Sequence, residues 1–410
     1  MQSDQRTPES ITDVVENGLC IGCGLCESMA PDRWQMAYTQ EGRLRPVPLI
    51  EIDTEKDQEI LSACPGSIAR ANLESTPCND DVWGGYHRME QVWATDSDVR
   101  FKAATGGLLT ALGVYLLESG RAEFILHCEA DPAAPMRTQW CISETALQVI
   151  SRAGSRYGPS ATLAGLQSAI DRDLPFAVIA KPCDAGAIRE RAKVDEALNR
   201  NLVAVLVMVC GGASDLGKSQ ALLDEFGIEE RNVTLFRYRG YGNPGATRVE
   251  TKDGHAREKT YNDLWADESG WRIQTRCKVC PDAIGDAADI AASDIWPGGG
   301  PVGEDAGFNG VITKTAIGES LYKHAVAAGL LTQGASISPR EFDELQPHQV
   351  RKKRALAARL RGMLSGGSCV YRHEGLRIEL LDGKDADEQQ QTRLRVESGR
   401  FRETLPSKNE

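Results

Sequence analysis

Residues 176–210 read FAVIAKPCDAGAIRERAKVDEALNRNLVAVLVMVC, and this segment predicts the architecture of the chain. Its two apolar runs, 176–180 and 202–209, have the length and composition of fully buried strands. The charged segment between them favours a helix, and a strand–helix–strand unit makes its two strands parallel with a right-handed crossover. Cys183 and Cys210 directly follow the strands. We therefore expect both thiols at the carboxyl edge of one sheet, where open α/β sheets bind ligands.

A CxxC pair, Cys277 and Cys280, supplies two further thiols. Together with Cys183 and Cys210 it would provide four ligands for a [4Fe–4S] cluster. By itself, a CxxC pair also suits zinc or a redox-active thiol pair. The two isolated cysteines could equally be small buried apolar side chains.

A second cysteine-rich segment, CIGCGLC at residues 20–26, has the spacing that directs three thiolates at three corners of one cubane. The glycines inside this run permit the unusual backbone angles of such a loop. Cys64 precedes a proline, as the last cysteine of bacterial ferredoxin motifs does, and is the predicted fourth ligand. The ligands predicted here are Cys20, Cys23, Cys26 and Cys64. A zinc knuckle or free buried cysteines are the alternatives.

Composition limits the class of protein. The 410 residues include 47 Lys and Arg against 59 Asp and Glu, a formal net charge of −12 that disfavours nucleic-acid binding. No apolar run reaches the roughly 18 residues of a membrane span, and the N-terminus lacks the pattern of a secretory signal. The chain has twelve cysteines. We expect a cytoplasmic protein whose clustered cysteines serve as metal or redox ligands rather than forming disulfides.

The predicted fold is α/β with mixed α+β insertions: a central parallel or mixed sheet flanked by helices, carrying a small ferredoxin-like iron–sulfur region. We expect residues 1–80 to form the N-terminal [4Fe–4S] region, 81–335 the central cofactor- and cluster-binding α/β domain, and 336–410 a charged helical region. Residues 83–100 are expected to be a linker or edge element, and 233–275 a β-rich insertion. The basic run 351–354 is expected to be a solvated helix face, or else a docking patch for an acidic partner.

Small residues at 105–107 precede an apolar helix, an arrangement that suits an anion such as a pyrophosphate but equally suits a plain helix cap. The segment 155–157 offers a hydroxyl, a guanidinium and an aromatic ring, and Lys181 stands beside a predicted cluster ligand. Each of these residues has an alternative role in capping or at the surface. The candidate cofactor contacts are Thr105, Gly106, Gly107, Ser155, Arg156, Tyr157 and Lys181.

The order of these motifs resembles the coenzyme F420 hydrogenase/dehydrogenase beta-subunit family. The matching segments are 20–26, 104–107, 154–157, 181–183, 209–211, 277–282 and 288–294. The resemblance implies non-covalent FAD, one or two [4Fe–4S] clusters, and a flavin surrounded by the segments at 105–107, 155–157 and 181–183. The chain departs from the family at Thr105, commonly serine, and at Ser293, commonly glycine.

We therefore expect an iron–sulfur flavoprotein oxidoreductase. Electrons would pass from ferredoxin or a partner subunit through two [4Fe–4S] clusters to FAD and on to a small organic substrate, or in the reverse direction. The alternative is a beta subunit that reduces or oxidises coenzyme F420 within a hydrogenase or dehydrogenase complex. A non-redox scaffold with structural zinc is a third possibility. A homo-oligomer is compatible with the sequence, and no catalytic acid or base is predicted.

Overall fold

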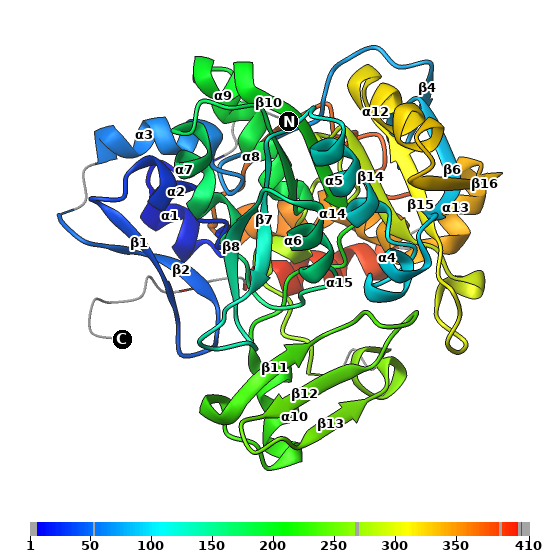
Figure 1. Cartoon of the computed structure of the whole chain (residues 1–410). Helices are drawn as coiled ribbons and strands as arrows, with labels where there is room; N and C mark the ends of the chain where they lie inside the picture. The colour runs from blue at the N-terminus through cyan, green and yellow to red at the C-terminus, as the bar shows by residue number, and fades with distance from the viewer. Residues whose placement is uncertain (1–5, 52–53, 267–269, 385–387, 401–402, 404–410) are drawn as a thin grey trace.

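A mixed sheet of eight strands forms the centre of the computed structural model, which describes residues 6–51, 54–266, 270–384, 388–400 and 403 (Figure 1). The strand order is β16-β6-β15-β14-β10-β9-β7-β8. Four inner strands, β14, β10, β9 and β7, are parallel, and antiparallel strands flank them on both sides. The strands are β6 (Arg88–Ala94), β7 (Phe124–Ala130), β8 (Thr138–Ser143), β9 (Phe176–Ala180), β10 (Leu202–Met208), β14 (Ile290–Asp294), β15 (Asn309–Thr313) and β16 (Leu331–Ser336). This confirms the predicted fold class.

The strand–helix–strand unit at 176–210 has the predicted form. β9 and β10 are parallel neighbours with Val178 opposite Val205, and α8 (Pro182–Ala192) and α9 (Glu196–Asn201) connect them. Pro182 occupies the first turn of α8, where its missing N–H costs no hydrogen bond. The proline therefore starts the helix immediately after the strand, and Cys183 falls in the helix's first turn.

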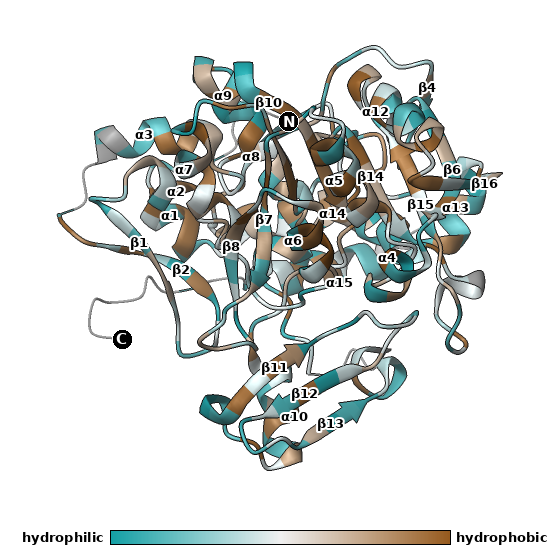
Figure 2. Cartoon of the chain, in the orientation of Figure 1, coloured by the Kyte–Doolittle hydropathy of each residue, from teal (hydrophilic) through white to brown (hydrophobic). Residues whose placement is uncertain are grey.

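Helices cover both faces of the sheet, which explains why its inner strands are apolar throughout. Successive residues of a strand point to opposite faces, so Ala177 packs in one core cluster and Val178 in the other. The first face is covered by α5 (Leu108–Glu118), α6 (Ala146–Ser151) and α12 (Ala316–Ala327). The second is covered by α7 (Leu166–Ile170), α8, α9, α13 (Pro339–Leu345) and α14 (Pro347–Ser365). Figure 2 shows hydrophobic residues concentrated in the central strands.

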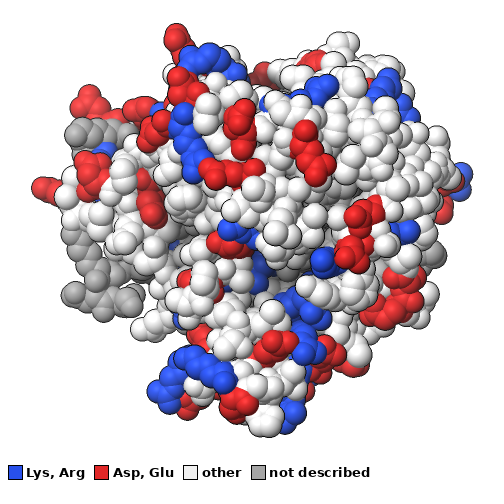
Figure 3. Space-filling view, in the orientation of Figure 1, with Lys and Arg blue, Asp and Glu red and all other residues white. Residues whose placement is uncertain are grey.

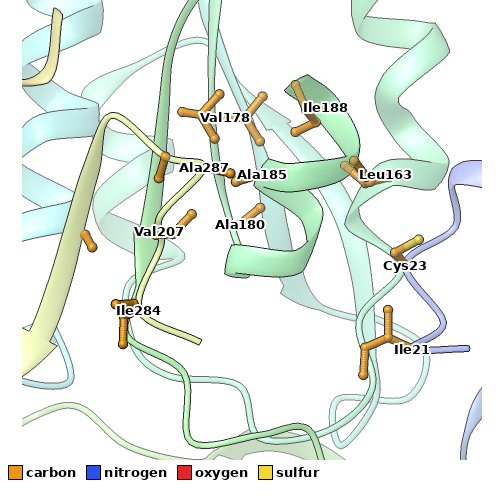
Figure 4. Packing of buried hydrophobic residues seen from close by; sticks show 14 of the residues in the cluster. Ile21, Cys23, Leu163, Val178, Ala180, Ala185, Ile188, Val207, Ile284 and Ala287 are labelled. Atoms are coloured by element: carbon orange, nitrogen blue, oxygen red, sulfur yellow. The ribbon is translucent and has the colours of Figure 1, made fainter. Parts of the chain in front are cut away.

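The core on the second face extends to the N-terminal cysteine segment. In Figure 4, Val178, Ala180 and Val207 of the sheet lie close to Ala185 of α8. Cys23 and Ile21 belong to the same buried cluster. The N-terminal segment is thus packed against the sheet domain.

The expectation of a linker or edge element at 83–100 is wrong. β5 (Gly84–Tyr86) is followed by β6, which lies inside the large sheet between β15 and β16, and by α4 (Ser97–Lys102). The polar residues Arg88 and Glu90 made this strand look like a surface segment in the sequence. In the structure they form an ion pair at 3.0 Å instead of facing open solvent. Val92 faces the core and is fully buried.

The N-terminal and C-terminal regions share one core. The N-terminal region contains α1 (Ile11–Glu16), α2 (Leu25–Met29), β1 (Trp34–Tyr38), β2 (Leu44–Pro48), α3 (Thr54–Ala63), β3 (Ile68–Arg70) and β4 (Cys78–Asp80). The C-terminal region is charged and mainly helical, with α13, α14, β17 (Arg372–Glu374) and α15 (Glu388–Ser398). β17 pairs in parallel with β3, and Leu19 and Trp34 pack with Met363 and Tyr371. The domain boundaries at 80/81 and 335/336 stay a prediction.

The expected β-rich insertion is a separate lobe. Its antiparallel strands are β11 (Val233–Arg237), β12 (Thr247–Thr251) and β13 (Ala256–Lys259), with α10 (Gly217–Phe226) beside them at the bottom of Figure 1. Short elements complete the chain: η1 (Thr162–Gly165), η2 (Glu230–Asn232), η3 (Asn262–Ala266), α11 (Thr275–Lys278) and η4 (Pro297–Gly299). Within the described ranges, every helix is too short or too polar to cross a membrane.

Candidate functional site

Four cysteines line one cavity in the N-terminal region. Cys20, Cys23 and Cys26 come from the loop between α1 and α2 and from α2 itself, and Cys64 follows α3. The rest of the lining is mainly apolar, with Ile11, Val14, Met36 and Ile60 among its residues. We call these four cysteines the N-terminal cysteine set.

Glycines clamp the loop that presents this set. Gly22 has φ +70° and Gly24 has φ +87°, a region that residues with a side chain seldom adopt. A Cβ at Gly22 would lie 2.4 Å from the Leu44 carbonyl oxygen, and one at Gly24 would lie 2.6 Å from the Ala164 backbone nitrogen. The loop therefore needs glycine both for its backbone angles and for its close packing.

Burial keeps the thiols of the N-terminal cysteine set protonated when nothing neutralises their charge. Desolvation raises the pKa of Cys20, and raises the pKa values of Cys23 and Cys26 well above the ordinary range. It also raises the pKa of Cys64 to about 12. Neighbouring thiols of the set raise the pKa values of Cys23, Cys26 and Cys64 further. A positively charged metal would supply the compensation that buried thiolates need.

The second group of thiols lies at the carboxyl edge of the parallel strands. Cys183 is in the first turn of α8, Cys210 follows β10, and Cys277 and Cys280 are on and just after α11. Desolvation raises the pKa of Cys210, and raises that of Cys277 to about 12, with further increases from neighbouring cysteines. The Ala213 N–H donates to Cys277 Sγ at 3.3 Å. We call these four cysteines the sheet-edge cysteine set.

Both donor sets suit an iron–sulfur cubane, since each offers four buried or half-buried thiols. In the described part of the chain, no three His, Cys, Asp or Glu side chains converge as ligands of a single metal ion would. A cubane has a separate iron at each corner, so its four ligands surround a cluster instead of meeting at one point.

An arginine that the sequence motifs did not indicate organises the region around Thr105 and Asp294. Arg239 is 2% exposed, and its guanidinium donates to Asp294 Oδ2 at 2.7 Å, to the Tyr157 hydroxyl at 3.1 Å and to the Ala104 carbonyl at 2.6 Å. Thr105 Oγ1 donates to the other carboxylate oxygen of Asp294. Burial would lower the pKa of Arg239, but Tyr157 and Asp294 outweigh it and raise that pKa. These contacts join the insertion lobe to the end of β14.

The other predicted cofactor contacts mostly have partners inside the protein. Gly107, at φ +81°, precedes α5, and a Cβ at Gly106 would lie 2.7 Å from the Asn309 nitrogen. Arg156 donates to the carbonyls of Pro135, Arg137 and Phe236 and lies over the Tyr238 ring. Ser155 hydrogen-bonds to the Tyr157 side chain. Their role as flavin contacts stays a prediction.

Lys181 also has hydrogen-bond partners inside the protein. Its Nζ donates to Asp184 Oδ2 and to the Ser160 carbonyl, both at 2.8 Å. Burial would lower its pKa, but Asp184, Cys183 and Cys23 raise it. Lys181 therefore lies within electrostatic reach of both cysteine sets.

Only part of the basic run at 351–354 is a solvated helix face. Lys353 of α14 is 4% exposed and pairs with Asp286 at 3.1 Å. Lys352 donates to the carbonyls of Cys210, at 3.3 Å, and Gly211, at 3.0 Å. Lys352 and Lys353 are therefore engaged in internal contacts, whereas Arg351 is exposed. In Figure 3, other lysines and arginines gather along the boundary between the sheet domain and the β11–β13 lobe.

Comparisons with known proteins find family models and relatives that are similar to this chain. Two models of coenzyme F420 hydrogenase/dehydrogenase match the chain: that of the N-terminal part of the beta subunit over residues 89–167, and that of its C-terminal part over residues 174–337. The F420-dependent formate dehydrogenase 1 subunit beta of Methanococcus maripaludis is 29% identical over 59% of this chain and 60% of its own length. The coenzyme F420 hydrogenase subunit beta of Methanococcus voltae is 23% identical over 65% of this chain and 88% of its own length.

A solved structure has the same fold. A chain of the F420-reducing [NiFe] hydrogenase complex from Methanosarcina barkeri superposes with a TM-score of 0.56 and 19% identity. The superposition covers 72% of this chain and 99% of that chain.

Proposed function

Because the chain belongs to the coenzyme F420 hydrogenase/dehydrogenase beta-subunit family, we propose that it is the electron-transferring subunit of an oxidoreductase complex. It would carry electrons between a catalytic partner subunit and coenzyme F420. The observation that carries this proposal is the presence of two sets of four cysteines shielded from water, one lining the N-terminal cavity and one at the sheet edge. The relatives named as beta subunits support the partner and the coenzyme.

The two cysteine sets are the proposed ligands of two [4Fe–4S] clusters. When bound, such clusters store and pass single electrons, and FAD exchanges them for the two-electron chemistry of an organic coenzyme. The chain's own contribution is to exclude water from the thiols and to hold the ligand loops rigid. Gly22 and Gly24 support the second role, because the contacts around them leave no space for a side chain.

The proposed flavin region is the boundary between the sheet domain and the insertion lobe. Arg239 supports this assignment, because it holds Asp294, Tyr157 and the Ala104–Thr105 backbone in one arrangement. Cys210 and the Gly211–Gly212 turn follow β10 at the same edge of the sheet. A flavin there would lie near the sheet-edge cysteine set, and short distances favour electron transfer between them.

Anaerobic purification followed by iron, sulfide and flavin analysis tests the proposal. We expect about eight irons per chain from two cubanes, bound FAD, and reduction of coenzyme F420 by chemically reduced protein. Reduced ferredoxin is offered in parallel, to test ferredoxin as the physiological partner. Colourless protein that contains zinc instead of iron would contradict the proposal.

A further inference from the structure

The two cysteine sets are neighbours in the fold, and the chain segments that carry their cysteines contact each other directly. A Cβ at Gly18, two residues before Cys20, would lie 2.8 Å from the side chain of Thr275, which begins α11. Arg45 reaches across the same boundary, where its Nη1 donates to Gln274 Oε1 at 2.8 Å. Segments close in sequence to cysteines of each set thus pack against one another.

Arg276 occupies this boundary. It is 3% exposed, it directly precedes Cys277, and its Nη2 and Nε donate to the Pro65 carbonyl at 2.7 and 3.1 Å. Pro65 directly follows Cys64 of the N-terminal cysteine set. The guanidinium also lies over the Tyr371 ring, 4.5 Å from its centroid. One side chain therefore links a ligand-bearing segment of each set.

The hydrogen bonds of Arg276 end on neutral groups. Its acceptors are the carbonyls of Pro65 and Val279, and within the described ranges no carboxylate pairs with it. Arg45 and Lys181, by contrast, pair with Glu403 and Asp184. Burying a charge without an opposite charge costs free energy of folding. A negatively charged group beside Arg276 would therefore stabilise the protein.

The groups that face Arg276 are cysteines of both sets. It interacts electrostatically with Cys64 on one side, and with Cys183, Cys277 and Cys280 on the other. Thiolates that ligate iron would supply the missing negative charge from both directions. Each electron added to either cluster would increase that negative charge, and a nearby guanidinium stabilises the added charge.

We propose that Arg276 is a positioning residue shared by the two clusters. Its fixed positive charge would make each of the two clusters easier to reduce. This rests on the proposed function, since it requires a cluster at each set. With a cluster bound at each set, transfer of one electron between them would oxidise one cluster and reduce the other, and Arg276 would keep its proton. The guanidinium attracts the electron at both ends of the transfer, so it favours exchange without trapping the charge on one side.

Lys352 provides a matched contrast, because among the described cysteines it contacts the sheet-edge set. Its Nζ donates to the carbonyls of Cys210 and Gly211, and it acts electrostatically on Cys210 and Cys277. Its loss should make only the sheet-edge cluster harder to reduce. Arg276 differs in that its loss should affect both.

The experiment is a redox titration followed by electron paramagnetic resonance on full-length, anaerobically prepared protein. In Arg276→Gln we expect both midpoint potentials to become more negative. The shift expected is about a tenfold change in the reduced-to-oxidised ratio at a fixed applied potential, which is about 59 mV for a one-electron couple. Arg276→Lys should restore both potentials, and Lys352→Gln should shift only one.

Unchanged potentials in Arg276→Gln, or a shift in only one cluster, would overturn this inference while the proposed function stands. Wild-type protein without iron would overturn the proposed function instead. If Arg276→Gln cannot retain iron, the midpoint potentials of Arg276→Lys test the inference instead. Potentials close to wild type in that variant support a role for the charge, and potentials shifted to negative values refute it.

Discussion

Among single residues, burial separates the predicted ligand Cys277 from Cys78, a cysteine outside both sets. Cys78 is exposed on β4, whereas Cys277 is 8% exposed and within electrostatic reach of Cys210 and Cys280. Burial beside other thiols leaves a thiol dependent on a metal for its charge. The two cysteines therefore form a matched pair for mutation.

Cys277→Ala should remove the sheet-edge cluster and leave the N-terminal one. The expected result is loss of roughly half the iron, because one of two cubanes is lost. Iron and sulfide analysis of anaerobic preparations measures it, and Cys78→Ser should retain the wild-type content. Unchanged iron in Cys277→Ala would show that the sheet-edge ligand set is wrong.

Burial also controls protonation at His127, which is not a predicted ligand. His127 on β7 is 7% exposed, and its Nε2 lies 2.7 Å from Ser143 Oγ. Desolvation, and then the nearby Arg152, lower its pKa to about 4, so the folded protein keeps this ring neutral at pH 7.

His127 should make the fold sensitive to mild acid. The unfolded imidazole has a pKa near 6.5, so as the pH falls from 6.5 towards 4 the unfolded state takes up a proton that the folded state does not. The stability present above pH 6.5 is thus lost, by about 3 kcal/mol in all. Urea unfolding at pH 7 and pH 4.5 should show a smaller loss for His127→Gln than for wild type. Equal losses would exclude His127 as the cause.

Among elements, the N-terminus of α2 shows how backbone geometry holds a ligand loop in place. Gly24 caps this helix at φ +87°, and the Cys23 carbonyl accepts a hydrogen bond from the Leu163 N–H at 2.9 Å. The short helix η1 (Thr162–Gly165) therefore packs directly on the loop. No side chain fits between them.

Gly24→Ala should destabilise the protein more than Gly120→Ala does. Both glycines have positive φ, which costs alanine about 1–2 kcal/mol. At Gly24, however, the added Cβ would lie 2.6 Å from the Ala164 nitrogen, whereas at Gly120 nothing lies within 4 Å. Urea unfolding measures the difference, and iron analysis should show loss from the N-terminal set in Gly24→Ala alone. Similar effects of the two substitutions would mean that the loop can move aside.

For the whole molecule, a buried ion cluster ties the C-terminal region to the sheet domain. Asp286 is 4% exposed and receives Lys314 at 3.1 Å, Lys353 at 3.1 Å and Arg377 at 2.6 Å. Lys314 follows β15, Lys353 belongs to α14, and Arg377 follows β17. Burial opposes the charge of Asp286, but its three cations hold its pKa well below the ordinary range.

Asp286→Asn should destabilise the protein by about 3–5 kcal/mol, because it leaves three buried or half-buried cations without their common anion. Asp98→Asn is the control, since Asp98 is exposed and its contact with Lys102 at 3.8 Å should contribute at most about 1 kcal/mol. Urea unfolding gives both values. An effect of Asp286→Asn no larger than the control's would show that the cations find other partners.

Short-range pattern was enough to predict the strand pair β9–β10 and both cysteine-rich segments. Residues that are adjacent in sequence remain adjacent after folding. The order of an apolar run, a proline and a cysteine therefore predicts the local structure directly. β6 was missed because Arg88 and Glu90 look like surface residues until the partner that neutralises them is known. Arg239 gave no signal either, since its aromatic neighbours and Asp294 come from separate segments.

The primary structure alone determined that β9 and β10 are parallel and that two groups of four thiols are candidate ligands, because spacing over a few residues sets both. Only the folded chain decided that the two thiol groups adjoin and that Arg276 lies between them. Its bond to the Pro65 carbonyl joins positions 211 residues apart. Such a contact depends on how distant elements pack together, and this packing produces no recognisable pattern in the local sequence.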